Sequence, residues 1–226
     1  GMKLDWRREW PQWVLIAAMF ALAALMWKRT PDTVPIHWDA AGNVNGYGGK
    51  FESLLLDPIV SVGAYLLMVA LPWIDPGRAN YANFSTAYDT IRVSVIALQA
   101  AVYFLILLAI NGSSVNIGVI VPMICGVVMI AIGNVMPKLR PNWFVGIKTP
   151  WTLSSKTAWD RTHRFGGRLF VAMGLVFMLG VLLPPELRVA VWLPAIFIPI
   201  IGLYVFSYVA WRGASDKIPP SGTTAA

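Results

Sequence analysis

Residues 91–136 read IRVSVIALQAAVYFLILLAI, then NGSSVN, then IGVIVPMICGVVMIAIGNVM. The first and third segments are 20 residues each and almost wholly apolar, and an α-helix needs about 20 apolar residues to cross a bilayer. Arg92 is their only charged residue and lies at the beginning of the first segment. The short polar segment between them is typical of a turn. This stretch therefore predicts a hairpin of two membrane-spanning helices.

Four more apolar runs flank this hairpin, at residues 10–27, 54–74, 169–183 and 189–211. The last two are separated only by Pro184-Pro185-Glu186-Leu187-Arg188. Because a Pro-Pro pair interrupts the hydrogen bonds of a helix, we expect a second hairpin here and not one long helix. The predicted fold is an all-α integral membrane protein, a transmembrane bundle of six helices.

The composition agrees with a chain surrounded by lipid. Of 226 residues, 57% are hydrophobic and only 13% are charged, about half the usual charged fraction. A soluble domain of this length has too little polar surface to cover so many apolar residues. The net charge of +7 is spread over the segments between the apolar runs, so a nucleic-acid partner is not expected. Cys125 is the only cysteine, which excludes a disulfide framework.

The lysines and arginines predict how the chain is oriented. With six spans both termini lie on one side, and that side receives 14 of the 18 lysines and arginines. Basic residues concentrate on the cytoplasmic side of membrane proteins. We therefore expect a multi-pass protein of the cytoplasmic membrane with both termini in the cytoplasm.

The spans divide into two predicted halves of three helices each. The N-terminal half, residues 2–110, contains a long outer loop at 28–53, and the C-terminal half, residues 111–211, contains a long inner loop at 137–168. Residues 212–226 are turn-forming and small, and we expect a disordered tail. Connections between packed helices usually have about 2–8 residues, so the two loops are the candidate functional segments.

The outer loop has the pattern of a small strand and a turn. Residues 34–38 alternate apolar side chains with Pro35 and His37, which is typical of an extended segment. Asn45-Gly46 is a dipeptide that favours tight hairpin turns. We expect an ordered lid over the helix ends.

Side chains that bind hard cations gather in the same loop, namely His37, Asp39, Asn43 and Glu52. Counted from Ala41, the positions of Asn43, Asn45, Gly46 and Glu52 approximate those of a calcium-binding loop, although an alanine stands where the first ligand should be an aspartate. No cofactor is expected, and a divalent cation is an alternative to turn residues that satisfy their own backbone.

The inner loop predicts a basic helix after Pro150, beginning at about Ser154. Trp159 and His163 are four residues apart and share one face. The helix also carries charged residues at the same spacing, namely Lys156, Asp160 and Arg164. A basic helix with tryptophan on its apolar side is typical of a membrane surface, so we expect a cytoplasmic interfacial helix leading into the fifth span.

Asp57 is the carboxylate that the pattern places inside a span, near the outer end of the second helix. Ionisable groups inside membranes are costly and usually functional or paired. Asp57 either pairs with Lys50 or Lys28, or lines a transport path with Gln99 and Asn134. No G-x-S-x-G or H-E-x-x-H motif is present, so an enzyme is not the leading interpretation.

At its two loops the sequence resembles the SdpI family of bacterial membrane proteins, known for immunity to a secreted peptide toxin. Residues 31–48 are similar to the family's N-terminal domain and residues 142–164 to its C-terminal signature. The matching motif positions are Pro35, His37 and Gly42 outside, and Asn142, Gly146, Lys148, Thr149, Trp151, Trp159 and His163 inside.

The resemblance implies immunity and signal transduction at the bacterial cytoplasmic membrane, and it supplies no catalytic residue. We expect the outer face to bind a peptide toxin or envelope ligand, with Trp38, Asp39 and Asn43 beside the motif positions. The helix of Trp159 and His163 would signal to a cytoplasmic regulator. The alternatives are a small proton-coupled or ion-coupled transporter and a metal-dependent membrane enzyme.

Overall fold

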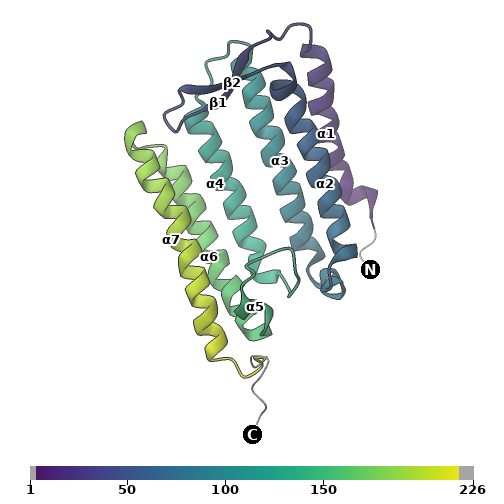
Figure 1. Ribbon diagram of the computed structural model, residues 1–226, viewed down its shortest axis with the longest axis vertical. Coiled ribbons are helices and arrows are strands. Elements are labelled where there is room, and N and C mark those ends of the chain that lie inside the picture. Colours follow the sequence, from purple (N-terminus) through teal and green to yellow (C-terminus); the bar gives the residue numbers. More distant parts are fainter. Residues whose placement is uncertain (1–3, 219–226) are drawn as a thin grey trace.

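The computed structural model describes residues 4–218, in which long helices lie side by side and a two-stranded sheet covers one end (Figure 1). The long helices are α1 (Trp6–Met26), α2 (Leu56–Ile74), α3 (Ser85–Ile110), α4 (Ile117–Val135), α6 (Lys156–Gly180) and α7 (Pro185–Arg212). The shorter elements are β1 (Val34–Trp38), β2 (Val44–Gly48), the π-helix η1 (Phe51–Leu55), the 3₁₀-helices η2 (Arg78–Phe84) and η3 (Met136–Lys138), and α5 (Pro150–Leu153).

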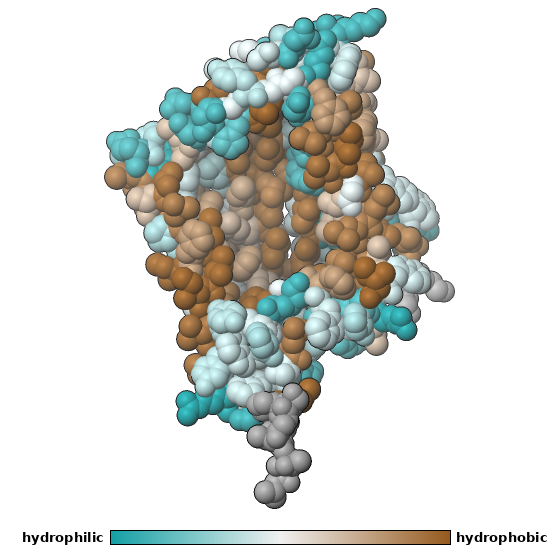
Figure 2. Space-filling model, in the orientation of Figure 1, coloured by the Kyte–Doolittle hydropathy of each residue, from teal (hydrophilic) through white to brown (hydrophobic). Residues whose placement is uncertain are grey.

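Within residues 4–218, five helical segments are long and apolar enough to cross a membrane, namely 6–26, 51–74, 78–110, 117–138 and 185–212. The prediction of a helical, multi-pass membrane protein is therefore confirmed. The space-filling view shows the corresponding belt of hydrophobic side chains between two more hydrophilic ends (Figure 2). The remaining predicted span falls in α6, whose first half carries Lys156, Asp160, Arg161, Arg164 and Arg168.

The long helices form two neighbouring groups. Helices α1, α2 and α3 contact one another, α6 packs between α4 and α7, and the contact of α3 with α4 joins the groups. Small residues bring α4 and α6 close together: a Cβ added to Gly126 would lie 2.6 Å from the carbonyl oxygen of Gly174. Such contacts are a common way for membrane helices to associate without large apolar side chains.

The predicted interfacial helix and the fifth span are one continuous helix, α6. Ser155 caps its first turn by accepting a hydrogen bond from the Ala158 N–H at 3.0 Å. Gly167 does not interrupt the helix, because it packs against α4: a Cβ at this position would lie 2.6 Å from the Gly133 carbonyl oxygen.

The start of α6 is also held by residues 213–218, which lie in the segment predicted to be a tail. The Ser155 hydroxyl donates to the Asp216 carboxylate at 2.6 Å, and the Thr157 N–H donates to it at 3.0 Å. The Ile218 N–H donates to the Ser154 carbonyl at 3.0 Å. Asp216 therefore acts as a second cap on α6. Residues 219–226 of the predicted tail lie outside the described residues.

The strand-and-turn lid is present as an antiparallel hairpin of β1 and β2. The predicted turn at Asn45-Gly46 is wrong, because both residues lie in β2. The chain reverses earlier, where the Asp39 carboxylate accepts two loop N–H groups at 2.9 Å each and Gly42 has a φ of 88°. A capped loop with a left-handed glycine thus outweighs the local preference of Asn-Gly.

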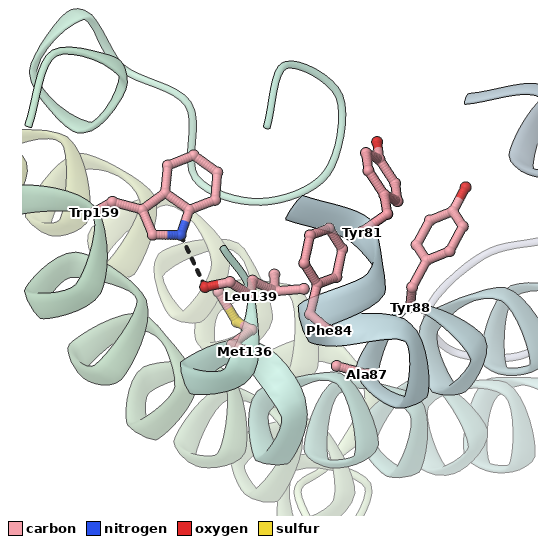
Figure 3. Packing of buried hydrophobic residues seen from close by; sticks show 7 residues of the cluster. All are labelled: Tyr81, Phe84, Ala87, Tyr88, Met136, Leu139 and Trp159. Atoms are coloured by element: carbon pink, nitrogen blue, oxygen red, sulfur yellow. Dashed lines mark hydrogen bonds between the residues drawn. The ribbon is translucent and has the colours of Figure 1, made fainter. Parts of the chain in front are cut away.

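The hairpin lies at one end of the bundle, and α1 begins and α7 ends at the other (Figure 1). We call these the hairpin end and the loop end. A core of buried side chains from η2, α3, η3 and α6 lies at the loop end (Figure 3). A second core joins α1, η1 and α3 toward the hairpin end.

Candidate functional site

The motif positions predicted from the sequence lie at opposite ends of the helices. The hairpin, residues 34–48, carries the outer positions. Residues 139–155, which we call the signature loop, connect η3 to α6 and contain α5. Together with the first turns of α6 they carry the inner positions, so the two motifs form two separate sites (Figure 1).

Trp159 and His163 form the centre of the site at the loop end. Both side chains are 0% exposed, and their rings stack with centroids 4.1 Å apart. The Trp159 indole N–H donates to the Leu139 carbonyl at 3.0 Å and so holds the signature loop against α6 (Figure 3). This face of the helix is therefore buried in protein and does not lie on a membrane surface.

The hydrogen bonds of His163 determine its protonation state. Its Nε2 accepts the N–H of Ile147 at 2.9 Å, and its Nδ1 lies 2.8 Å from the Trp159 carbonyl oxygen. The Ile147 N–H can only donate, so Nε2 carries no proton and Nδ1–H donates to the carbonyl. Burial lowers the pKa of His163 to about 4. The residue is a neutral structural histidine at neutral pH.

Gly146 and Asn142 shape the loop over this ring. Gly146 has a φ of 122°, and a Cβ there would lie 2.5 Å from the His163 Nε2. The Asn142 side chain is 2% exposed and accepts the N–H groups of Phe144 and Val145 at 3.0 and 2.6 Å. Its amide donates back to backbone carbonyls on both sides of the turn. Both motif positions therefore stabilise the backbone conformation of the loop.

Thr149 and Trp151 attach the signature loop to α7. Thr149 caps α5, and its hydroxyl lies 2.9 Å from that of Ser207. The Trp151 ring meets the edges of Tyr204 and Tyr208, with centroids 5.0 and 5.2 Å apart. The loop is thus fixed to α7 as well as to α6.

The exposed side chains of the signature loop are Trp143, Phe144, Lys148, Pro150 and Leu153. Among the predicted inner positions, Lys148 is therefore the one with an accessible charge. Its Nζ donates to the Phe144 backbone carbonyl at 2.7 Å.

Asp75 is an important residue of this site that the sequence analysis missed. It is 1% exposed and directly follows α2. Its carboxylate accepts the Tyr81 hydroxyl at 2.7 Å and the Trp143 N–H at 3.1 Å, which ties the end of α2 to the signature loop. A carboxylate at the C-terminal end of a helix is electrostatically unfavourable. The position of Asp75 directly after an apolar helix could therefore have indicated, from the sequence alone, that its carboxylate has a specific partner.

The hairpin end exposes His37. Its Nδ1 is in hydrogen-bond contact with the Asn45 side chain, and the imidazole stays accessible on β1. Tyr47 on β2 is 65% exposed. Pro35 and Trp38, on the same strand as His37, are half-buried and pair with β2. His37 and Tyr47 are therefore the exposed ring-bearing side chains of the hairpin, residues 34–48.

Asp39, Gly42 and Asn43 form the reversal of the hairpin. The loop N–H groups that Asp39 accepts, that of Asn43 foremost, lower the pKa of this carboxyl. A Cβ on Gly118, at the start of α4, would lie 2.7 Å from the Gly42 nitrogen. The reversal thus rests directly on the backbone of α4.

The metal candidates are not gathered into a cation site. In residues 4–218 no group of three His, Cys, Asp or Glu side chains has a suitable arrangement for a metal ion. The Asp39 carboxylate is used by the loop, and the Glu52 carboxylate accepts the Gly49 N–H at 2.8 Å. His37 and Asn43 are both exposed.

Arg188, at the beginning of α7, holds the hairpin in place and was not predicted. It is 6% exposed and donates to the carbonyls of Ala40, Gly118 and Val181 at 3.4, 3.3 and 3.1 Å. It therefore joins the hairpin to α4 and to the residue after α6. A cation at the N-terminal end of a helix is unfavourable. The position of Arg188 could therefore have indicated, from the sequence alone, that its charge has specific partners.

Asp57 is half-buried in α2. The ion pair with Lys50 or Lys28, one of the two expectations for Asp57, is not formed, and Lys50 lies 4.0 Å from Asp32 instead. Among the described residues Asp57 has no salt bridge within 4.0 Å. It stays a candidate without an ionic partner.

A buried ion pair inside the N-terminal group was also missed. Glu9 of α1 and Arg92 of α3 are 3% and 2% exposed and form two hydrogen bonds of 2.9 and 2.6 Å. The Tyr65 hydroxyl donates to Glu9 at 2.7 Å. Arg92 itself indicated this pair in the sequence, because an arginine within an apolar run needs a partner for its charge. The partner lies 83 residues away and cannot be read from local pattern.

Comparison with known proteins places both sites in recognised regions. Residues 138–210 match the model of the SdpI/YfhL protein family, and residues 14–62 match a domain of unknown function (DUF1648). The chain is 25% identical over 163 residues to the "Immunity protein SdpI" of Bacillus subtilis (strain 168), covering 72% of this chain and 76% of that protein. No solved structure matches the chain.

The first range contains the signature loop with Trp159 and His163, and the second contains the hairpin. The five apolar helical segments and the similarity to an immunity protein agree with each other. The resemblance predicted from the two loops is thereby confirmed: this is a multi-pass membrane protein in which residues 138–210 match the SdpI/YfhL family model and which is similar to an SdpI immunity protein.

Proposed function

We propose that this protein confers immunity by binding a peptide toxin or another envelope ligand at its hairpin end, and that it contacts a cytoplasmic regulator at its loop end. The observation that carries the proposal is the hairpin, which exposes His37 and Tyr47 while Arg188 fixes it to α4 and α7. A ligand held there would act on the same helices that carry the signature loop at the other end.

The proposal includes a topology of six spans in the bacterial cytoplasmic membrane with both termini in the cytoplasm. Helix α6 would be the additional span, because its apolar half packs between α4 and α7, both of which are long and apolar enough to cross. Its charged half then lies at the loop end, where α1 begins and α7 ends. This assignment places the basic residues of α6 on the cytoplasmic side.

The exposed part of the signature loop is the surface proposed for the regulator. Trp159 and His163 are 0% exposed and can act only by supporting the loop. Trp143, Phe144 and Lys148 offer two aromatic rings and a cation for contact. Aromatic residues are enriched in the central parts of protein interfaces.

A survival assay tests binding at the hairpin. His37→Ala is expected to abolish protection of cells that secrete the relative's toxin and lack its immunity protein, because the variant removes an exposed ring without disturbing a buried contact. Membrane abundance of the variant should equal that of the wild type. Ser114→Ala, exposed between α3 and α4, is the matched control and should protect fully. Full survival with His37→Ala would contradict the proposed contact.

A small proton-coupled carrier is the second candidate function. Asp57, Ser61 and Tyr65 are four residues apart on α2 and so share one stripe of the helix. Ser61 is 0% exposed with its hydroxyl unpartnered among the described residues, and Tyr65 donates to Glu9. These groups form an interrupted polar line inside the N-terminal group of helices, which favours proton movement over simple packing.

Proteoliposomes carrying a pH-sensitive dye distinguish this candidate. If the protein moves protons, Asp57→Asn is expected to lower the flux at least about tenfold, because the carboxyl is the group of the line that changes charge. Asp32→Asn, whose side chain is 99% exposed, is the matched control. Flux equal to that of empty liposomes in the wild type would remove the carrier from consideration and leave the immunity proposal untouched.

A further inference from the structure

Three arginines form an exposed ridge on α6 that neither proposed site uses. Arg161, Arg164 and Arg168 are spaced by three and four residues, so they follow one side of the helix. Within residues 4–218 none of them forms a salt bridge within 4.0 Å, and the neighbouring Asp160 pairs with Lys156 at 2.6 Å. The ridge therefore presents positive charge that the described part of the protein does not neutralise.

An apolar groove adjoins the ridge on each side. The groove between α6 and α7 has a volume of about 430 Å³, and Phe206 and Val209 form part of its wall. The groove between α4 and α6 has a volume of about 380 Å³ and is lined by Gly133 and Val171. Arg164 and Arg168 border both grooves. Each groove thus combines an apolar wall with the same pair of guanidinium groups.

The position of the ridge along α6 suits a lipid headgroup. Arg168 is the last charged residue of the helix, and the segment from Leu169 to Gly180 that follows is apolar. The arginines therefore lie where the hydrophobic belt meets the hydrophilic loop end. Basic pockets between membrane helices at this level bind anionic headgroups, and a guanidinium matches phosphate oxygens in bidentate geometry.

We propose that the arginine ridge is a binding site for an anionic glycerophospholipid. Its phosphate lies between Arg164 and Arg168, and its acyl chains follow the grooves beside α6. A free phosphate would use the charge but would leave the apolar walls uncovered, whereas the acyl chains that surround these helices can cover them. The occupant is therefore a lipid, and the arginines select lipids with a negatively charged headgroup.

Native mass spectrometry of the purified full-length protein tests the site. The detergent-solubilised protein is mixed with equal amounts of phosphatidylglycerol and phosphatidylcholine, and retained lipid is counted. The wild type should retain phosphatidylglycerol preferentially. Arg164→Gln/Arg168→Gln should lower its retention on the order of tenfold, because each basic residue near an anionic headgroup adds to the attraction. Retention of phosphatidylcholine should not change.

Two further variants separate the built site from general electrostatics. Lys28→Gln/Arg29→Gln removes two exposed charges at the hairpin end and should leave retention unchanged. Val209→Trp fills the groove between α6 and α7 without altering charge and should lower phosphatidylglycerol retention; Val209 is 59% exposed, so folding should tolerate the ring. Equal retention of the two lipids by the wild type, no effect of the double arginine variant, or displacement of the lipid by millimolar inorganic phosphate would each overturn the proposal.

Discussion

His163 shows how one side chain can hold a loop on a helix. Its ring gives the Ile147 N–H an acceptor that the loop itself does not provide, and Trp159 covers one face of the ring. A second proton on the ring would point at the Ile147 N–H and break this arrangement. The folded structure therefore requires the neutral form of His163. This requirement lowers the free energy of unfolding only when the pH falls.

The stability of the protein should accordingly depend on pH through His163. The pKa is about 4 in the folded chain and 6.5 ordinarily, so between these values the unfolded chain binds the extra proton. Stability from this group is complete above about pH 6.5 and is lost as the pH falls toward 4, by about 3 kcal/mol in total. Thermal unfolding in detergent between pH 7 and pH 4 measures the loss.

The matched variants are His163→Gln and His37→Gln. The first removes the buried titrating ring, so its stability should be lower at pH 7 but should fall less steeply toward pH 4 than that of the wild type. The second removes an exposed ring and should keep the wild-type slope. If both variants lose stability with the wild-type slope, another group is responsible for the pH dependence.

Among the elements, α1 and α3 are joined by the one pair of opposite charges that is buried on both sides within residues 4–218. Glu9 and Arg92 meet through two parallel hydrogen bonds, which is the strong geometry for a carboxylate and a guanidinium. The pair fixes how α1 docks against α3. Nearer the hairpin end, the same helices are held together by apolar packing around Met19 and Tyr103. Removing Glu9 leaves the buried Arg92 with only the longer 3.4 Å contact to the Asp89 carboxylate.

We therefore expect Glu9→Leu to be severely destabilising, by about 3–5 kcal/mol, because Arg92 keeps its charge without a carboxylate of comparable geometry. The double variant Glu9→Leu/Arg92→Met should recover much of this loss, since an apolar pair needs no ionic partner. Membrane abundance and thermal unfolding in detergent are the measurements.

Arg8→Ala is the control for the variants of Glu9 and Arg92. Its salt bridge with Asp89 is 2.7 Å long, but the arginine side chain is 43% exposed. Exposed pairs contribute about 1 kcal/mol or less, so this variant should remain close to the wild type. A double variant that is less stable than Glu9→Leu alone would show that Arg92 is satisfied by other groups.

In the whole molecule, the two groups of helices are connected at both ends. At the hairpin end Arg188 joins the hairpin, which follows α1, to α4 and α7. At the loop end Asp75 and Tyr81 join the end of α2 to the signature loop. The arrangement provides two polar clamps around an apolar middle, as expected where lipid replaces water along the belt (Figure 2).

Cysteine labelling of intact cells tests the proposed topology of this arrangement. In a Cys125→Ser background, Asn43→Cys on the hairpin should react with a membrane-impermeant maleimide, because the proposed topology puts the hairpin on the envelope side. Trp143→Cys in the signature loop should react only after lysis. The two positions are both exposed in the structure, so they are matched in accessibility. Reversed labelling would overturn both the orientation and the proposed ligand face.

The sequence by itself determined the class of protein, the positions of the long helices and the extended segment at 34–38. These features depend on local information, because about 20 apolar residues suffice to predict a span and a Pro-Pro pair to separate two. The same holds for the two family motifs, whose residues are close together along the chain. The hairpin turn was misplaced because Asn45-Gly46 is a local signal, whereas the actual turn depends on Asp39 and on contact with α4.

The tertiary structure alone decided what the motif residues do. Trp159 and His163 have the sequence of an amphipathic surface helix, and only the docking of the signature loop makes them a buried support. Asp75 and Arg188 likewise depend on groups far away in the sequence. A buried polar group is stable only when its partners are in place, and those partners are set by how the helices pack together.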